Sequence, residues 1–156
     1  MRFCDLVVLL RGQALLGLVH FLFISEIIMG LDQYAYSISN RVAGTKQVDI
    51  EMPPRTKKKE LAFWRKFNHL HGWMQSLYYD KKGLDNQFNC ASVRLMPADL
   101  DALEKALIAN TLQHTPGFFF GSAEIYPEDV KNTLEFITEA RVAIKEGRAV
   151  IYDSWW

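Results

Sequence analysis

The amino-acid sequence predicts an α+β fold, with a single sheet of about four short strands and three amphipathic helices packed mainly on one side. The composition, 49% hydrophobic and 23% charged, is typical of one globular domain with an adequate core. Segments with the apolar period of a helix alternate along the chain with short aromatic, half-polar segments. The strands of a doubly wound sheet would instead be continuous Val, Ile and Leu runs, so helices layered on one face of a sheet are favoured.

Residues 1–28 differ in character from the rest of the chain, and three interpretations of them stay open. Arg2 and the apolar run 14–24 resemble a membrane-directing segment, but no small-residue cleavage site follows. A membrane span needs about twenty apolar residues, and Arg11 and Glu26 are among the residues that interrupt this stretch. The segment could also be a real extra helix, or an upstream translation artefact if translation begins at Met29. We expect residues 29–156 to form a single globular domain.

The first predicted strand covers residues 30–39. Its apolar set is Tyr34, Tyr36 and Ile38, which we expect to face inward, with Asp32 on the same side at the start of the strand. A surface loop follows over residues 40–54, because glycine and a pair of prolines interrupt the pattern.

The stretch 60–79 is predicted to be the central helix. Its apolar stripe at helical spacing consists of Phe63, Phe67, Leu70, Met74 and Leu77. A second row beside this stripe consists of Trp64, Asn68, His71 and Gln75. A polar row beside a core stripe is where a helix lines a cleft, or where it binds neighbouring loops.

The remaining elements follow from caps and periodicity. Prolines followed by acidic residues open predicted helices at Pro97 and Pro127, and Gly147 ends the second of these helices. The other predicted strands are residues 89–96, the aromatic segment 115–122 between glycines, and residues 149–155, where we expect burial of at least Trp155.

The net charge and the histidine spacing argue against several kinds of partner and ligand. Eighteen basic and eighteen acidic residues cancel, so nucleic acid is an unlikely partner, and the basic run 55–59 is better explained as a solvated loop end. His69 and His71 project from different sides of a regular helix, so they do not chelate one ion, and no spacing completes a zinc site with His114. We therefore expect no metal and no cofactor. A membrane contact is expected only if residues 1–28 are translated and retained.

His71 is the best single candidate for a functional residue. With Asn68 one turn before it, His71 could act as an oriented general base, with a partner carboxylate from Asp32 or Glu124. The alternative is a histidine held by hydrogen bonds at a helix–loop junction. The candidate catalytic residues are therefore His71, Asn68, Asp32 and Glu124, and the candidate ligand-binding residues are Trp64, Gln75, Arg141 and Phe119.

Two of these ligand-binding candidates have structural alternatives. Arg141 falls within the apolar stripe of the last helix, where it either binds an anion or complements the helix dipole. Phe119 belongs to a run of three phenylalanines, one face of which could be a stacking platform, although core packing of both faces is the favoured explanation.

Four motifs give the chain a resemblance to a known family. They are MGLDQYAY at 29–36, ELAFWRKFNHLHGW at 60–73, GFFFGSAEIY at 117–126 and IYDSW at 151–155. The pattern resembles a family of small uncharacterised proteins of bacteriophages and prophages, some of which are labelled phosphoglycerate kinase. Such a kinase needs two α/β domains and a nucleotide site, and this sequence has neither G-x-G-x-x-G nor G-x-x-x-x-G-K-[ST].

The resemblance implies a small phage-type accessory protein, and the lack of a recognisable catalytic set favours binding over catalysis. We expect it to bind a host or phage macromolecule, with a protein as the partner, in the cytoplasm of the bacterial host cell. The second hypothesis is a small enzyme or small-ligand binder with a pocket around Trp64, Asn68 and His71, closed by Asp32 and the 117–122 segment.

Overall fold

The computed structural model describes residues 30–156, so the expectations for residues 1–28 and for a start at Met29 lie outside the described part. The elements follow the order strand, short helix, strand, helix, strand, two helices and strand. Their bounds are β1 Asp32–Ser39, α3 Asn40–Ala43, β2 Lys59–Arg65, α4 Asn68–Asp80, β3 Ser92–Leu95, α5 Pro97–Ile108, α6 Pro127–Lys145 and β4 Arg148–Trp155.

The four strands form one antiparallel sheet in the order β2-β1-β4-β3. The last strand of the chain, β4, is central and pairs with both β1 and β3. Helices α5 and α6 begin at their predicted prolines with acidic residues in the first turn. The predicted α+β class with a four-stranded sheet is confirmed.

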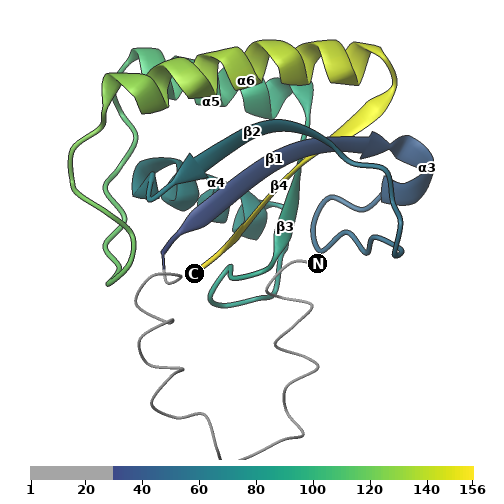
Figure 1. Cartoon of the computed structure of the whole chain (residues 1–156), viewed down its shortest axis with the longest axis horizontal. Coiled ribbons are helices and arrows are strands. Elements are labelled where there is room, and N and C mark those ends of the chain that lie inside the picture. Colours follow the sequence, from purple (N-terminus) through teal and green to yellow (C-terminus); the bar gives the residue numbers. More distant parts are fainter. Residues whose placement is uncertain (1–29) are drawn as a thin grey trace, which may run out of the picture.

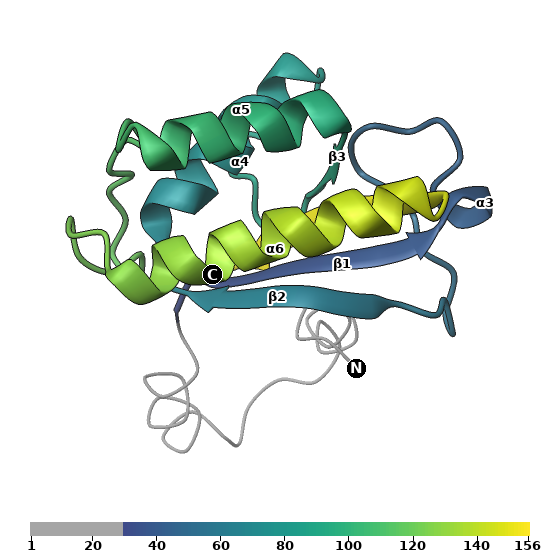
Figure 2. The same cartoon turned by 90° about the horizontal axis from the view of Figure 1, so that it is seen from above.

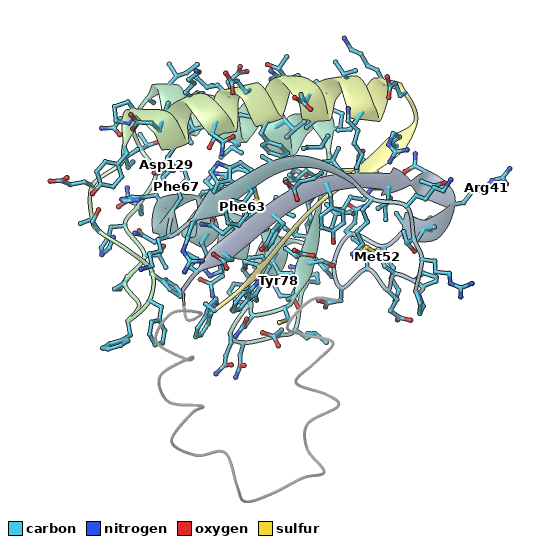
Figure 3. All side chains as sticks on the ribbon, in the orientation of Figure 1. Arg41, Met52, Phe63, Phe67, Tyr78 and Asp129 are labelled. Carbon is cyan, nitrogen blue, oxygen red and sulfur yellow. The ribbon has the colours of Figure 1, made fainter. Side chains whose placement is uncertain are left out.

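Helices α4, α5 and α6 cover one face of the sheet (Figures 1 and 2). Phe67 and Tyr78, at the two ends of α4, both enter the core (Figure 3). The other members of this core include Ala35, Trp64, Leu70, Met74, Val93, Leu100, Leu103, Phe136, Ile137, Val150 and Tyr152. The burial of these large side chains between sheet and helices is the main stabilising contribution to the domain.

The opposite face of the sheet is also covered. A smaller core of Tyr36, Ile38, Ala43, Ile50, Ala149 and Ile151 forms there. Met52, in the segment between α3 and β2, packs against this core (Figure 3). Tyr36 and Ile38 are therefore buried as predicted, but they face away from the helices, while Ala35 faces them. Both faces of β1 are apolar because both are covered.

The predicted helix 60–79 is wrong in its first third, where the chain forms β2. Burial alternates along β2: Ala62 and Trp64 are buried, while Phe63 and Arg65 are exposed. The chain then turns at Lys66, which has a positive φ of 61°. A short apolar run fits a helical stripe and a strand equally well, and pairing with β1 decides for the strand.

The predicted aromatic strand 115–122 is also wrong, because this segment is an irregular loop between α5 and α6. The Phe120 amide bonds back to the Gly117 carbonyl in a turn, and Gly121 has a φ of 91°. We call residues 114–122 the aromatic loop. The loop crosses the end of α4 instead of joining the sheet.

Candidate functional site

Asn68, the first residue of α4, ties the aromatic loop to the helix. Its Nδ2 donates to the carbonyls of Phe120 (3.2 Å) and Ser122 (2.6 Å). Its Oδ1 accepts from the Thr115 amide (3.1 Å) and lies 2.9 Å from His114 Nδ1. One buried side chain therefore supplies the hydrogen bonds that a strand partner would otherwise give to the loop.

A cavity of about 390 Å³ lies between the aromatic loop, α4 and the end of β4. Its lining residues are His71, Gln75, Asn86, Gln87, Thr115, Pro116, Gly117, Phe118, Phe119, Phe120 and Trp156. No Lys, Arg, Asp or Glu side chain is among them. The volume falls in the range of about 300–1,000 Å³ that is usual for ligand pockets. We call this space the aromatic cavity.

The three consecutive phenylalanines of the loop have different environments around the aromatic cavity. Phe118 is 96% exposed at its rim, whereas Phe120 is buried at 7%. The Phe120 ring packs edge-on against the His71 ring and the Trp156 ring, with centroids 5.1 Å apart in both pairs. Phe119 is half-buried between them. The loop therefore presents one aromatic ring to solvent and anchors itself with another.

His71 is 1% exposed and forms the floor of the cavity. Burial lowers the pKa of His71 from 6.5 to about 4, so its imidazole is neutral at pH 7. Its Nδ1 lies 3.3 Å from the Ser154 Oγ and 3.4 Å from the Tyr152 hydroxyl. Tyr152 in turn donates to Gln33 Oε1 at 2.9 Å. This chain of polar groups connects the cavity floor to the centre of the sheet.

Trp156 closes the cavity at the end of β4. Its backbone makes two hydrogen bonds with the Asn89 side chain, at 2.8 and 3.2 Å. Among residues 30–156, three side-chain nitrogens are fully buried without a hydrogen-bond partner: Gln33 Nε2, His69 Nδ1 and Trp156 Nε1. Two of these belong to the cavity wall or to the polar chain behind it, and such groups cost stability unless a ligand or water satisfies them.

Three of the sequence-predicted site residues come together at the aromatic cavity, namely His71, Gln75 and Phe119. Asn68 lies behind the wall and holds the loop. Trp64 does not reach the cavity, because it stands on β2 in the main core, where its indole donates to Thr133 Oγ1 at 3.0 Å. The helical row predicted from Trp64 to Gln75 is therefore correct only from Asn68 onward.

A carboxylate partner for His71 is not found among the described residues. Asp32 points to the other face of β1 from Gln33 and pairs with Arg65 at 2.6 Å. Burial raises the pKa of Asp32, although the charge of Arg65 acts in the opposite direction. Glu124 is exposed, beyond the end of the aromatic loop. The geometry therefore gives no support to the predicted dyad with either acid.

Arg141 joins two helices rather than lining the aromatic cavity. Its guanidinium lies 2.6 Å from Asp101 and 2.7 Å from Glu104, both on α5. These hydrogen bonds raise the pKa of Arg141, and the same contact with Arg141 lowers the pKa of Glu104. The positive charge of Arg141 is matched by two carboxylates within the protein, which explains the arginine without an anion ligand.

Two further histidines, His69 and His114, lie next to Asn68. The rings of His69 and His114 have centroids 5.6 Å apart. Burial first, and the charge of His114 second, lower the pKa of His69. Within residues 30–156, no three His, Cys, Asp or Glu side chains gather in a way that could hold a metal ion. In the same range, no helix has the length and apolar character needed to cross a bilayer.

Sequence reasoning missed Trp156 and the 86–87 segment as parts of the site, whereas the 117–122 segment was expected to close it. The terminal tryptophans predicted a docked chain end, but which cavity they close depends on the sheet order. Both tryptophans are half-buried, so Trp155 is less buried than predicted. Comparison of the chain with family models, with curated proteins and with solved structures finds no match to any of them.

Proposed function

We propose that this chain is a non-catalytic binding protein that captures an uncharged, apolar group of a macromolecular partner in the aromatic cavity. The single observation that carries the proposal is Phe118, which is 96% exposed at the rim of a cavity without ionised side chains. Isolated exposed apolar residues are common, but an aromatic ring beside a cavity resembles the few residues that dominate protein interfaces.

The loop that carries Phe118 is ordered before any partner arrives. Four hydrogen-bond contacts of Asn68 and the packing of Phe120 against His71 hold its backbone. A preordered loop loses little conformational entropy on binding, so more of the contact energy contributes to affinity. This supports a docking site over a loop that is merely a connection.

The surroundings of His71 favour binding over catalysis. A general base works best when its pKa lies near the working pH, and burial holds the pKa of His71 at about 4. The neighbouring Ser154 hydroxyl is 2% exposed, so a substrate does not reach it as a nucleophile. His71 is therefore better suited to bind a ligand than to transfer a proton.

The resemblance to phage and prophage proteins suggests the origin of the partner. We propose that the partner is a protein of the bacterial host or of the phage, met in the host cytoplasm. The neutral net charge agrees with a protein partner better than with nucleic acid.

The test is quantitative co-purification with wild-type protein and two matched variants. Phe118→Ala removes the ring at the rim, and Ile108→Ala removes an apolar side chain that is 73% exposed on α5 and does not line the cavity. We expect a stoichiometric partner to be lost with Phe118→Ala and kept with Ile108→Ala. Equal recovery with both variants would contradict a docking site at the aromatic cavity.

A second candidate is a binder of small molecules in the same cavity, favoured by its volume of about 390 Å³ and by the buried His71 among its lining residues. A small ligand would remain with the protein through gentle purification. Mass spectrometry of denatured native protein should then release one compound in stoichiometric amount, and a purified protein free of any such compound would count against this candidate.

A further inference from the structure

We infer that the aromatic cavity accepts an aromatic ring that carries one hydrogen-bond donor, an indole or a phenol, and that His71 Nε2 accepts this hydrogen bond. The inference rests on the proposed function and deepens it, because it names the captured group as a tryptophan or tyrosine side chain of the partner.

The neighbours of His71 on β4 determine its tautomer. The Tyr152 hydroxyl proton is committed to Gln33 Oε1, so the Tyr152 oxygen is left as an acceptor. The contact between this oxygen and His71 Nδ1 at 3.4 Å is then a hydrogen bond only if Nδ1 carries the proton. The Ser154 hydroxyl donates to the Tyr152 oxygen, so the Ser154 Oγ, 3.3 Å from Nδ1, is left as an acceptor that shares the same proton.

The other ring nitrogen of His71, Nε2, is left as a hydrogen-bond acceptor. A neutral imidazole with its proton on Nδ1 has a lone pair on Nε2. Within residues 30–156, both hydrogen bonds of the His71 side chain are made by Nδ1, and the ring lines the cavity. The polar group that the floor offers is therefore an acceptor, which selects a ligand with an N–H or O–H group.

The lining of the aromatic cavity limits the charge that a ligand can carry. Because burial lowers the pKa of His71 to about 4, the floor carries no charge at pH 7. The lining has no basic side chain, so an anionic ligand group would lose its hydration without gaining a counter-charge. Carboxylate groups are therefore disfavoured.

The aromatic rings in the walls of the cavity favour an aromatic ligand. The rings of Phe118, Phe119, Phe120 and Trp156 surround the cavity, and Phe120 and Trp156 already meet edge to face at 79°. Aromatic rings gain from such offset and edge-on contacts with a further ring. An aliphatic group would fill the space but would leave the His71 lone pair desolvated without a donor.

The test compares ligand pairs that differ only in the donor. Indole and 1-methylindole, and separately phenol and anisole, are titrated into the full-length wild-type chain at pH 7. The readouts are heteronuclear NMR shifts of residues 115–120, of Trp156 and of the His71 ring nitrogens. We expect indole to bind about tenfold more tightly than 1-methylindole, phenol to exceed anisole in the same sense, and the Nε2 signal to move on binding.

A variant outside the cavity tests the tautomer separately. Tyr152→Phe keeps the ring but removes the hydroxyl that fixes the proton on Nδ1, and Tyr152 is not a lining residue. The preference for indole over 1-methylindole should shrink in this variant, while 1-methylindole binding stays as in the wild type.

Equal affinities of the wild type for indole and 1-methylindole would overturn the donor requirement, while leaving the cavity as an aromatic binding site. No binding by any of the four compounds would overturn the inference outright. The proposed function is judged independently, since partner loss with Phe118→Ala does not depend on the donor.

Discussion

At the residue scale, Asn68 and His71 lie one turn apart on α4 and contact different parts of the protein. Asn68 faces the aromatic loop and fixes it, whereas His71 faces the cavity and the hydroxyls of β4. A stability measurement and a binding measurement should therefore separate them.

Replacement of Asn68 tests its role as the tie. Asn68→Ala removes the side chain that bonds Phe120, Ser122 and Thr115, and should cost about 2–3 kcal/mol of unfolding free energy, because buried backbone groups lose their partners. Amide exchange should accelerate over residues 115–122. Asn68→Asp keeps the acceptor for the Thr115 amide and loses both donors, so exchange should rise at 120–122 more than at 115. Unchanged exchange in both variants would show that other contacts hold the loop.

Protonation of His71 gives a second prediction at this scale. Its folded pKa of about 4 lies below the unfolded value of 6.5, so above pH 6.5 both states are neutral and the group adds no pH dependence. As the pH falls from 6.5 to 4, the unfolded state takes up the proton first, and stability falls by about 3 kcal/mol in total. Denaturant melts of wild type and His71→Asn should differ in pH slope over this window, with the flatter profile in the variant. Parallel profiles would contradict a buried, neutral His71.

At the element scale, the junction between β2 and α4 determines where the aromatic loop lies. Gly121 has a φ of 91°, and a Cβ added there would sit 2.5 Å from the Lys66 carbonyl oxygen. The loop therefore passes directly against the backbone turn that ends β2. This close approach also brings Phe120 next to His71.

Substitution at Gly121 should disturb the loop more than a positive φ alone explains. Gly121→Ala combines an unfavourable φ with a backbone clash and should cost about 2–3 kcal/mol. Gly147→Ala is the matched control, since its φ is 74° with no atom within 4 Å of the added Cβ, and it should cost about 1 kcal/mol. Thermal or denaturant melts measure both. Equal losses would mean that the loop moves aside freely.

The same elements show how far the sequence alone predicts the structure. The prolines and acidic residues at the starts of α5 and α6 act within one turn, so their positions were predictable. The strand β2 was not predictable, because Ala62 and Trp64 fit the helical period and the strand period alike, and pairing with β1 decides between them. The aromatic loop was not predictable either, because its hydrogen-bond partner is the distant Asn68. Of the site, His71 and Gln75 were predictable from helical periodicity, while Trp156 joins them only through the sheet order.

At the scale of the whole molecule, the central position of β4 makes the end of the chain a structural requirement. Ile151 and Tyr152 are 0% exposed, one on each face of the sheet, and β4 joins β1 to β3. The strand also carries the hydroxyls behind His71, and Trp156, which closes the cavity, follows directly after it. Fold and candidate site thus share one element.

Deletion of residues 151–156 should therefore unfold the domain. The loss of two large buried side chains and two rows of strand pairing exceeds the total stability of about 5–15 kcal/mol that domains have. Circular dichroism on heating should show no cooperative transition. Trp155→Ala, which shortens a half-exposed side chain at the end of the strand, should keep the cooperative melt. A cooperative melt of the deleted protein at the wild-type temperature would mean that β4 is dispensable.

Photo-crosslinking shows directly whether the aromatic cavity is the surface that meets a partner. A photoreactive phenylalanine analogue replaces Phe118 in one protein and Ile108 in another, and both are irradiated in lysate of cells that naturally produce the chain. Both positions are exposed, but only Phe118 lines the cavity. We expect one dominant protein adduct at position 118 that is absent at position 108. Adducts of equal number and yield at the two positions, or none at position 118, would contradict it.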